Sequence, residues 1–478
     1  TGSQNIAIGY QALYNNTAGS NTAVGYESLK ANTTGASNVA VGAHALDSNT
    51  TASANVAVGL DALGGNTTGG SNTACGHRAL KSNTTGSSNT ALGSQVLMNT
   101  TASSNTAVGA FAMQNSTTGS HNTAVGLETL KSNQTGTNNA AFGAGALKNN
   151  TSSFNTGIGR HALENNTSGT KNTGVGNLAL LSNTTGSFNT SLGYDALGDN
   201  TTGEKNVAVG SHSLLVNETG SNNTAVGEAA LNQNTASNNT AIGFESLKLN
   251  TTGIKNVAVG SSTLDANIDG ENNTALGHNS LSAATSANSN VAVGYNTLDA
   301  TTTGGGNTAL GANALTSNTT GIRNTAIGQA TLTSNTTAQF SVAIGYRALN
   351  ANTTGMSNVA VGSAALQDNQ TGGSNTAVGR SVLVSNTGDN NTAIGERALF
   401  QNTSGSNNAA FGRRTLYENT TGTQNTAVGA QAGDLTTEGD NNTSIGYQAD
   451  PSSATADNEV TLGNSSIATL RCNVQTIS

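Results

Sequence analysis

The chain has 478 residues, of which 9% are charged and 3% aromatic; it contains 60 glycines and no tryptophan, and its net charge is −8. An ordinary globular domain carries about 25% charged residues, and large aromatic side chains usually anchor a wide core, so we expect a thin core of small aliphatic residues. The sequence has no basic run interleaved with aromatics and no stretch of 18 apolar residues, which argues against nucleic-acid binding and membrane insertion. We expect no cofactor. Because the chain begins in mid-pattern and without Met, we expect a fragment or a processed product.

A short motif, N-T-A-[VIL]-G, recurs along the whole chain. Its closing glycine occurs 28 times, and of the 27 intervals between these glycines 22 are 17 residues long and five are 16. The full consensus is N-T-A-[VIL]-G-x-x-[AS]-L-x-x-N-T-T-G-x-x. Disordered segments have no reason to hold aliphatic residues at fixed spacing, so the pattern indicates a tandem-repeat fold. The first motif glycines of the regular series are Gly25, Gly42, Gly59 and Gly76.

The motif N-T-A-V-G predicts one short strand per repeat. Its period of two places Thr and Val on one face and Asn and Ala on the other. Stacked repeats would lie about 4.8 Å apart, as neighbouring strands do, and we expect two apolar stacks to form the core. The expected core stack consists of Val24, Val41 and Val58 with Leu29, Leu46 and Leu63.

The asparagine four residues before each motif glycine predicts a ladder of side-chain amides, each donating to the next coil. A row of ligand-binding amides is the functional alternative. In the segment N-T-T-G, asparagine is expected to bond nearby backbone and glycine to supply a positive φ at a corner. The predicted ladder includes Asn21, Asn38, Asn55, Asn72 and Asn89.

Seventeen residues are too few for a strand and a full helix. The predicted fold is therefore all-β: a tandem-repeat parallel β-solenoid or β-roll with about 17 residues per coil. Two apolar residues and one alanine per coil bury little, so we expect a homotrimeric fibre in which a second face is buried along a shared axis.

The pattern changes near the C-terminus. The leucine row stops after Leu416, and residues 447–458 contain Pro451 within a Ser/Ala/Asp-rich stretch. We expect a solenoid shaft over 1–446, a transition over 447–458 and a C-terminal β-cap over 459–478 that covers the open strand edge. The residues expected to point into this cap are Val460, Leu462, Ile467, Leu470 and Val474.

Residue types that carry chemistry are scattered over the repeats. We expect the histidines to be solvent-facing, without a pairing to carboxylates at ligand spacing, and no catalytic or metal site. A polysaccharide depolymerase remains an alternative; it predicts paired carboxylates across a groove. The histidines are His44, His77, His121, His161, His212 and His278, and the carboxylates after the motif glycine include Glu27, Asp61, Glu128, Asp195 and Glu245.

Three further patterns leave alternatives open. Threonine rows suggest ice binding only if the face is regular, and Val, Ala or Ser often replaces the threonine. Asn-Thr-Thr at Asn32, Asn66 and Asn83 matches the glycosylation acceptor, or is simply a turn. Cys75 occupies a position that holds Val or Ile elsewhere, and it lies many repeats from Cys472, so we expect no disulfide between them.

The repeated N-T-A-V-G-x-x-A-L resembles the coils of trimeric β-roll heads in bacterial surface adhesins, which use a related N-S-V-A-I-G pattern. The Asn-Thr-Thr-Gly repeat is similar to the shafts of bacteriophage tail fibres. Both resemblances imply a trimeric fibre.

The last 22 residues, D-N-E-V-T-L-G-N-S-S-I-A-T-L-R-C-N-V-Q-T-I-S, resemble the segment upstream of the endosialidase-type intramolecular chaperone of phage tail fibres and spikes. In that family the chaperone drives trimerisation and then cuts itself off near a Ser-Asp junction. The resemblance implies a mature, self-processed trimer and makes Ser478 the candidate processing end.

Together these patterns predict a structural protein, not an enzyme: a tail fibre of a phage or phage-like particle, on the virion surface and outside the cell. Its expected partners are two further copies of the chain, a host-surface glycan or protein at the tip, and other tail proteins at the N-terminus. A bacterial cell-surface adhesin or matrix fibre with the same fold is the alternative.

Overall fold

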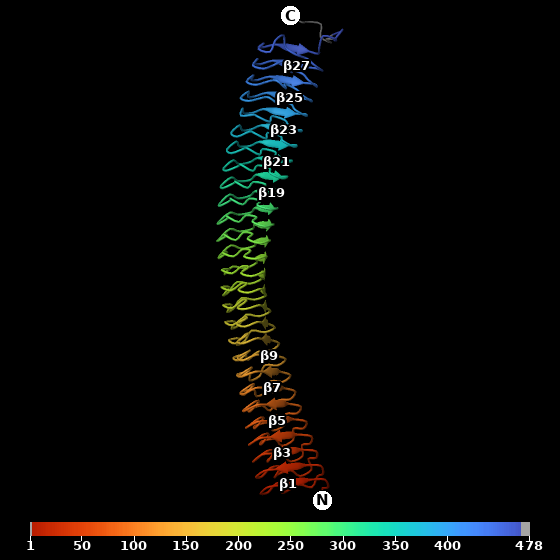
Figure 1. Cartoon of the computed structure of the whole chain (residues 1–478), viewed down its shortest axis with the longest axis vertical. Coiled ribbons are helices and arrows are strands. Elements are labelled where there is room, and N and C mark those ends of the chain that lie inside the picture. Colours follow the sequence, from red (N-terminus) through yellow and green to blue (C-terminus); the bar gives the residue numbers. More distant parts are fainter. Residues whose placement is uncertain (1, 470–478) are drawn as a thin grey trace, which may run out of the picture. The chain divides into compact units, whose positions relative to one another are not determined.

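The computed structural model describes residues 2–469; it contains no helix in this range, and each regular element is a three-residue strand. The chain divides into two compact units, Thr1–Ile242 and Gly243–Ser478. Each unit is a parallel β-solenoid with about 17 residues per turn, in which the strand arrows stack in sequence order (Figure 1). The predicted all-β solenoid is confirmed. The described range ends before Leu470, so Leu470, Cys472, Val474 and Ser478 lie outside it.

The first unit contains 15 strands, and each pairs in parallel with the next. They are β1 Ile6–Ile8, β2 Thr22–Val24, β3 Val39–Val41, β4 Val56–Val58, β5 Thr73–Cys75, β6 Thr90–Leu92, β7 Thr106–Val108, β8 Thr123–Val125, β9 Ala140–Phe142, β10 Thr156–Ile158, β11 Thr173–Val175, β12 Thr190–Leu192, β13 Val207–Val209, β14 Thr224–Val226 and β15 Thr240–Ile242.

The second unit contains 13 strands with the same parallel pairing. They are β16 Val257–Val259, β17 Thr274–Leu276, β18 Val291–Val293, β19 Thr308–Leu310, β20 Thr325–Ile327, β21 Val342–Ile344, β22 Val359–Val361, β23 Thr376–Val378, β24 Thr392–Ile394, β25 Ala409–Phe411, β26 Thr426–Val428, β27 Thr443–Ile445 and β28 Val460–Leu462.

The motif glycines hold a backbone conformation that other residues avoid. Gly42 has a φ of 135°, and a Cβ built on it would lie 2.5 Å from the carbonyl oxygen of Gly59 in the next coil. Both the conformation and the close approach of the coils therefore require glycine. In the N-T-T-G corner the asparagine bonds nearby backbone as predicted, with Asn32 Nδ2 2.8 Å from the carbonyl oxygen of Gly35, but the glycine was assigned wrongly, because Gly35 is not among the residues with a positive φ. Left-handed residues instead include Glu27, at φ 56°, and Leu29, at φ 49°.

The core of each coil is narrower than expected. The middle residue of the strand, such as Ala40 in β3, is fully buried, and so is the leucine row that includes Leu29, Leu46 and Leu63. The valines were placed wrongly, since the third residue of each strand points away from the lumen. Val41 is 36% exposed and Val58 37%, and Val24 is partly exposed. Alternation puts Ala and Val on opposite faces, and the lumen accepts the smaller side chain.

The stack continues past the expected end of the shaft. Strand β28 pairs in register with β27, so that Ile445 lies beside Leu462 and residues 447–458 form the connection within one more coil. The sequence predicted a separate cap from residue 459, but the first strand of that segment, β28, instead extends the solenoid by one coil. Val460, Leu462 and Ile467 were predicted to point inward, but they are 71%, 48% and 56% exposed.

Candidate functional site

The predicted asparagine ladder is buried, and amides donate between adjacent coils as expected at some rungs, since Asn38 Nδ2 lies 3.2 Å from Asn21 Oδ1. Further hydrogen bonds of the ladder were not predicted. Asn21 Oδ1 accepts from the backbone N–H of Asn38 in the next coil, at 2.9 Å, and Asn38 Oδ1 accepts from that of Asn55 in the same way. Asn38 Nδ2 donates to the carbonyl oxygen of Ala52 across its own coil, at 2.9 Å. The side-chain oxygen thus accepts a hydrogen bond from the next coil, and the side-chain nitrogen bonds a carbonyl group at the opposite corner of its own coil. Asn72 and Asn89 repeat the arrangement.

A second buried ladder stands where the sequence predicted only a turn. Asn49 Nδ2 donates to Asn32 Oδ1, at 2.7 Å, and Asn66 Nδ2 donates to Asn49 Oδ1, at 2.9 Å. Each amide also donates to the carbonyl oxygen three residues on, as Asn49 does to Ala52. Because Asn32, Asn66 and Asn83 are fully buried, a glycan on their Nδ2 atoms would displace these bonds. Both asparagine rows are structural in this fold and leave no row of amides exposed to a ligand.

The outward face of the strands is free of charge, with an apolar row at the third residue and a mostly threonine row at the first. The third residue is always Val, Ile, Leu, Phe or Cys, and the first is Thr, Val, Ala or Ile. None of the 17 Lys and Arg or 25 Asp and Glu residues occupies either row. We call the outward first and third residues of the strands the strand face; each unit carries one. Soluble monomers rarely expose a contiguous apolar patch above a few hundred Å², so the strand face is the strongest candidate for an interaction site.

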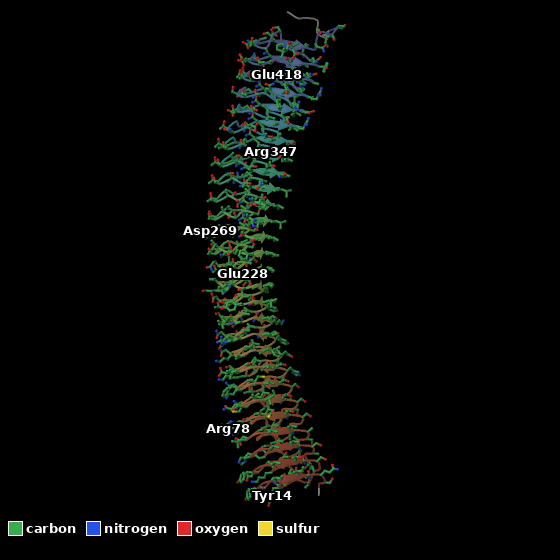
Figure 2. All side chains as sticks on the ribbon, viewed as in Figure 1. Tyr14, Arg78, Glu228, Asp269, Arg347 and Glu418 are labelled. Atoms are coloured by element: carbon green, nitrogen blue, oxygen red, sulfur yellow. The ribbon has the colours of Figure 1, made fainter. Side chains whose placement is uncertain are left out.

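The charged side chains lie on the connecting segments, as the labelled Arg78, Glu228, Asp269, Arg347 and Glu418 illustrate (Figure 2). Several charged side chains form ion pairs between positions two and five after the motif glycine. Glu27 lies 2.8 Å from Lys30 and Glu245 lies 2.7 Å from Lys248. The charged side chains therefore lie away from the strand face.

The carboxylates considered for catalysis are mostly held by lysines. Hydrogen bonds from Lys131 and then from Lys148 lower the pKa of Glu128 to about 2. The hydrogen bond from Lys81 holds the pKa of Asp61 below its usual value, whereas burial raises the pKa of Asp195.

Two histidines approach carboxylates, contrary to the sequence prediction. His161 Nδ1 lies 2.7 Å from Glu164 Oε2, and His44 Nδ1 lies 3.6 Å from both Glu27 Oε2 and Asp47 Oδ2. The spacing of three residues along the corner brings His161 onto Glu164. No group of three or more metal-binding side chains forms within residues 2–469.

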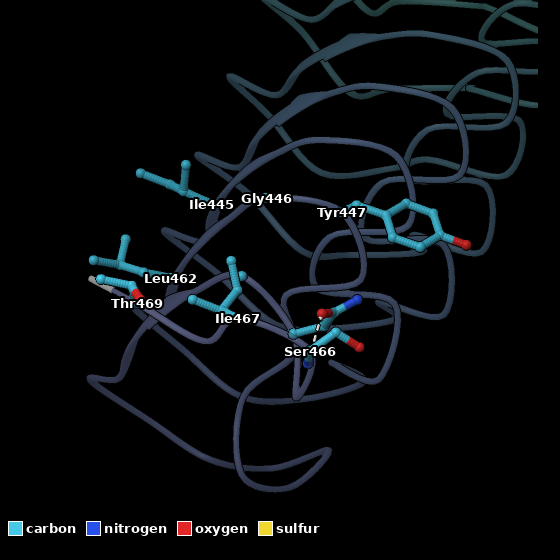
Figure 3. Close-up of a pocket in the computed structure, with 9 residues that line it drawn as sticks. Ile445, Gly446, Tyr447, Leu462, Ser466, Ile467 and Thr469 are labelled. Atoms are coloured by element: carbon cyan, nitrogen blue, oxygen red, sulfur yellow. Dashed lines mark hydrogen bonds between the residues drawn. The ribbon is translucent and has the colours of Figure 1, made fainter. Parts of the chain in front are cut away.

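The C-terminal end of the second unit carries an apolar hollow. Ile445 and Leu462, which belong to the strand face, line it together with Ile467 and Tyr447 (Figure 3). Gly463 departs from the other motif glycines, with a φ of 73°, and a Cβ built on it would lie 2.3 Å from Ile467 Cγ1. The hollow therefore extends the strand face at this end.

The architecture defines the protein as a parallel β-solenoid. Models of known protein families gave no match to the chain, and neither did curated protein sequences. The described residues contain no helix that could cross a membrane.

Proposed function

We propose that the chain is the shaft of a homotrimeric fibre, in which the strand faces of three copies pack together around a common axis. The observation that carries the proposal is the absence of charge from two side-chain rows repeated in every strand of both units. A solvated face has no need to exclude charge so strictly, since surface positions normally mix both signs.

The size of the strand face agrees with this role. If each third residue contributes roughly 50 Å² of exposed apolar surface, the 15 strands of the first unit expose on the order of 750 Å², close to the area per partner in a standard stable interface. The lumen of each coil holds little beyond alanine, leucine and asparagine, so association adds the burial that a thin core lacks.

The two rows of the strand face differ in polarity, and this difference favours a trimer over a dimer. Two sheets packed face to face would bury both rows equally and remove the threonine hydroxyls of the first row from water, which is costly without new hydrogen bonds. Around a threefold axis, the third row can lie innermost while the hydroxyls of the first row stay nearer to solvent.

The kind of fibre is proposed from the resemblances. The segment from residue 457 resembles the region before a self-cleaving trimerisation chaperone, so we propose a tail fibre of a phage or phage-like particle. The shaft would hold a distal tip, which contacts a host-surface glycan or protein, away from the tail proteins that bind the N-terminus. The reading frame after the codon for Ser478 distinguishes this from the adhesin: a chaperone sequence supports the tail fibre, and a membrane-anchor barrel or sorting signal supports the adhesin.

Charge substitution tests the interface. The triple variant Val41→Lys, Val58→Lys, Leu92→Lys places three cations on the strand face without touching the lumen. We expect a folded monomer by sedimentation, with unchanged β circular dichroism. The matched control is Thr34→Lys, Thr51→Lys, Thr68→Lys, in an exposed row that already carries Asp269 and Glu438, and it should remain trimeric. If both triple variants keep the same mass as the wild type, the strand face is not the interface.

A further inference from the structure

The two outward residues of a strand are matched in size. Phenylalanine is the third residue in two strands, β9 and β25, and these are also the two strands with alanine as the first residue. In the other 26 strands the first residue is Thr, Val or Ile and the third is never Phe. The largest side chain of one row therefore always accompanies the smallest of the other.

Intermediate sizes follow the same rule. Leucine is the third residue in β6, β12, β17 and β19, and the first residue is threonine in all four. Where the first residue is the bulkier valine, the third is Val or Ile, except in β28 at the end of the stack. A large third residue thus occurs where the first residue is small.

A solvent-exposed surface does not require the sizes of the first and third residues to match. The first and third side chains of a strand leave the same face about 6.6 Å apart, and Phe142 and Phe411 are 41% and 37% exposed. Solvent accommodates any combination of sizes, whereas a close-packed interface does not, because an added methylene without space costs free energy. The matching indicates that both residues of one strand contribute to one packed layer.

We infer that the copies in the fibre run parallel and in register, so that the third residue of each strand packs against the first residue of the same strand in the next copy. Phe142 of one copy would then lie on Ala140 of its neighbour. This inference rests on the proposed trimer and specifies how its chains are arranged. Rotation about a threefold axis keeps equivalent residues at one height and brings two different patches together. A twofold axis across the fibre would reverse one chain and bring β9 against a different strand.

The parallel, in-register arrangement predicts where Cys75 lies in the trimer. It is the third residue of β5 and a free, partly exposed thiol. In a parallel, in-register trimer the three Cys75 thiols lie at one height around the axis. A reversed chain would separate them by many coils.

Cross-linking tests the direction and register. In a Cys472→Ser background, a short bismaleimide should join Cys75 of one copy to Cys75 of another and give a covalent dimer on a denaturing gel. Val378→Cys in a chain that also carries Cys75→Ser should do the same in the second unit. Thr68→Cys with Cys75→Ser, outside the strand face, should not. A trimer in which neither strand-face cysteine cross-links would overturn the inference and leave the proposed trimer standing; a monomeric wild type would remove both.

Substitution tests the size matching. Ala140→Val should accelerate thermal dissociation of the trimer in detergent at least about tenfold, because the added methyl groups meet Phe142 of the neighbouring copy. Thr123→Val in the adjacent strand creates the Val-Ala-Val sequence already present in β3 and should have little effect. The double variant Ala140→Val, Phe142→Val should restore slow dissociation. Equal behaviour of Ala140→Val and Thr123→Val would contradict the inference.

Discussion

Asn49 donates from Nδ2 to Asn32 Oδ1, one coil away, over 2.7 Å, and receives a hydrogen bond from Asn66 in turn. This chain of amides passes through the lumen beside the leucine row. It satisfies corner carbonyl groups that a narrow, dry core could not leave unpaired.

Replacing Asn49 with aspartate should break this ladder. Its carboxylate would face Asn32 Oδ1 and the Ala52 carbonyl oxygen without a donor, and an uncompensated buried charge costs about 3 kcal/mol or more. We expect faster amide hydrogen exchange in the coils around β3 and β4. Asn49→Thr is the matched control, because Thr100 and Thr301 already occupy this row, fully buried. Asn49→Thr also removes the amide but adds no charge, so equal exchange in the two variants would contradict the expected cost of the buried carboxylate.

Gly59→Ala should be among the most damaging single changes. Gly59 has a φ of 132°, and the added Cβ would lie 2.6 Å from the carbonyl oxygen of Gly76. Strain and the clash together should cost about 3 kcal/mol or more, measured as a lower thermal midpoint. In the same coil, Gly64→Ala meets nothing closer than 3.4 Å and should be nearly neutral. A neutral Gly59→Ala would contradict the assigned conformation.

β-Branched side chains in the leucine row should destabilise the fold. Leu63 is fully buried at φ 51°, a left-handed conformation that β-branched residues avoid. Leu63→Met should lose less than about 1.5 kcal/mol, because Met113 adopts the same conformation in this row. Leu63→Val should lose about 2 kcal/mol more. Thermal unfolding of both variants checks the difference, and equal losses would count against left-handed geometry.

Glu128 should confer acid sensitivity. Lys131 and Lys148 lower its pKa to about 2, below the value near 4.5 of an unpaired glutamate. Its ion pairs therefore stabilise the fold above pH 4.5, and this contribution falls as the pH drops from about 4.5 to about 2.

The thermal midpoint of Glu128→Gln should therefore approach that of the wild type as the pH is lowered through this range. Salt should shrink the difference, since the side chain is close to solvent. Glu228→Gln is the control, because Glu228 is exposed and forms no ion pair within the described part of the chain. A wild-type advantage that stays constant down to pH 2 would contradict the ion pairs.

The spacing of the motif predicted the solenoid and the strand positions, because the period of two and the stack of coils leave one consistent alternation. The alternation also placed alanine opposite the valines, but the valine face was taken for the buried one, and the alanine face is buried instead. The spacing did not predict which apolar row faces the lumen. Val41 and Leu46 are both aliphatic, so the sequence does not distinguish them. The width of the coil decides the outcome, because the lumen has room for alanine and leucine while valine points outward.

The second ladder was missed for a related reason. Asn32 has the same chemistry in a turn as in a stack, and only the alignment of successive corners reveals that its amide reaches the next coil. The strand face was visible in the sequence as a charge-free pair of positions. The outward direction of the valines leaves its apolar row exposed, and this exposure is why we propose a partner for it.

The mass of the native particle in solution, measured by light scattering or sedimentation before and after boiling in detergent, tests the central claim most directly. Three chains of 47.3 kDa, about 142 kDa, that fall to one chain on boiling are the predicted result. A particle of one chain before boiling would contradict the trimeric fibre and leave the strand face without its proposed partner.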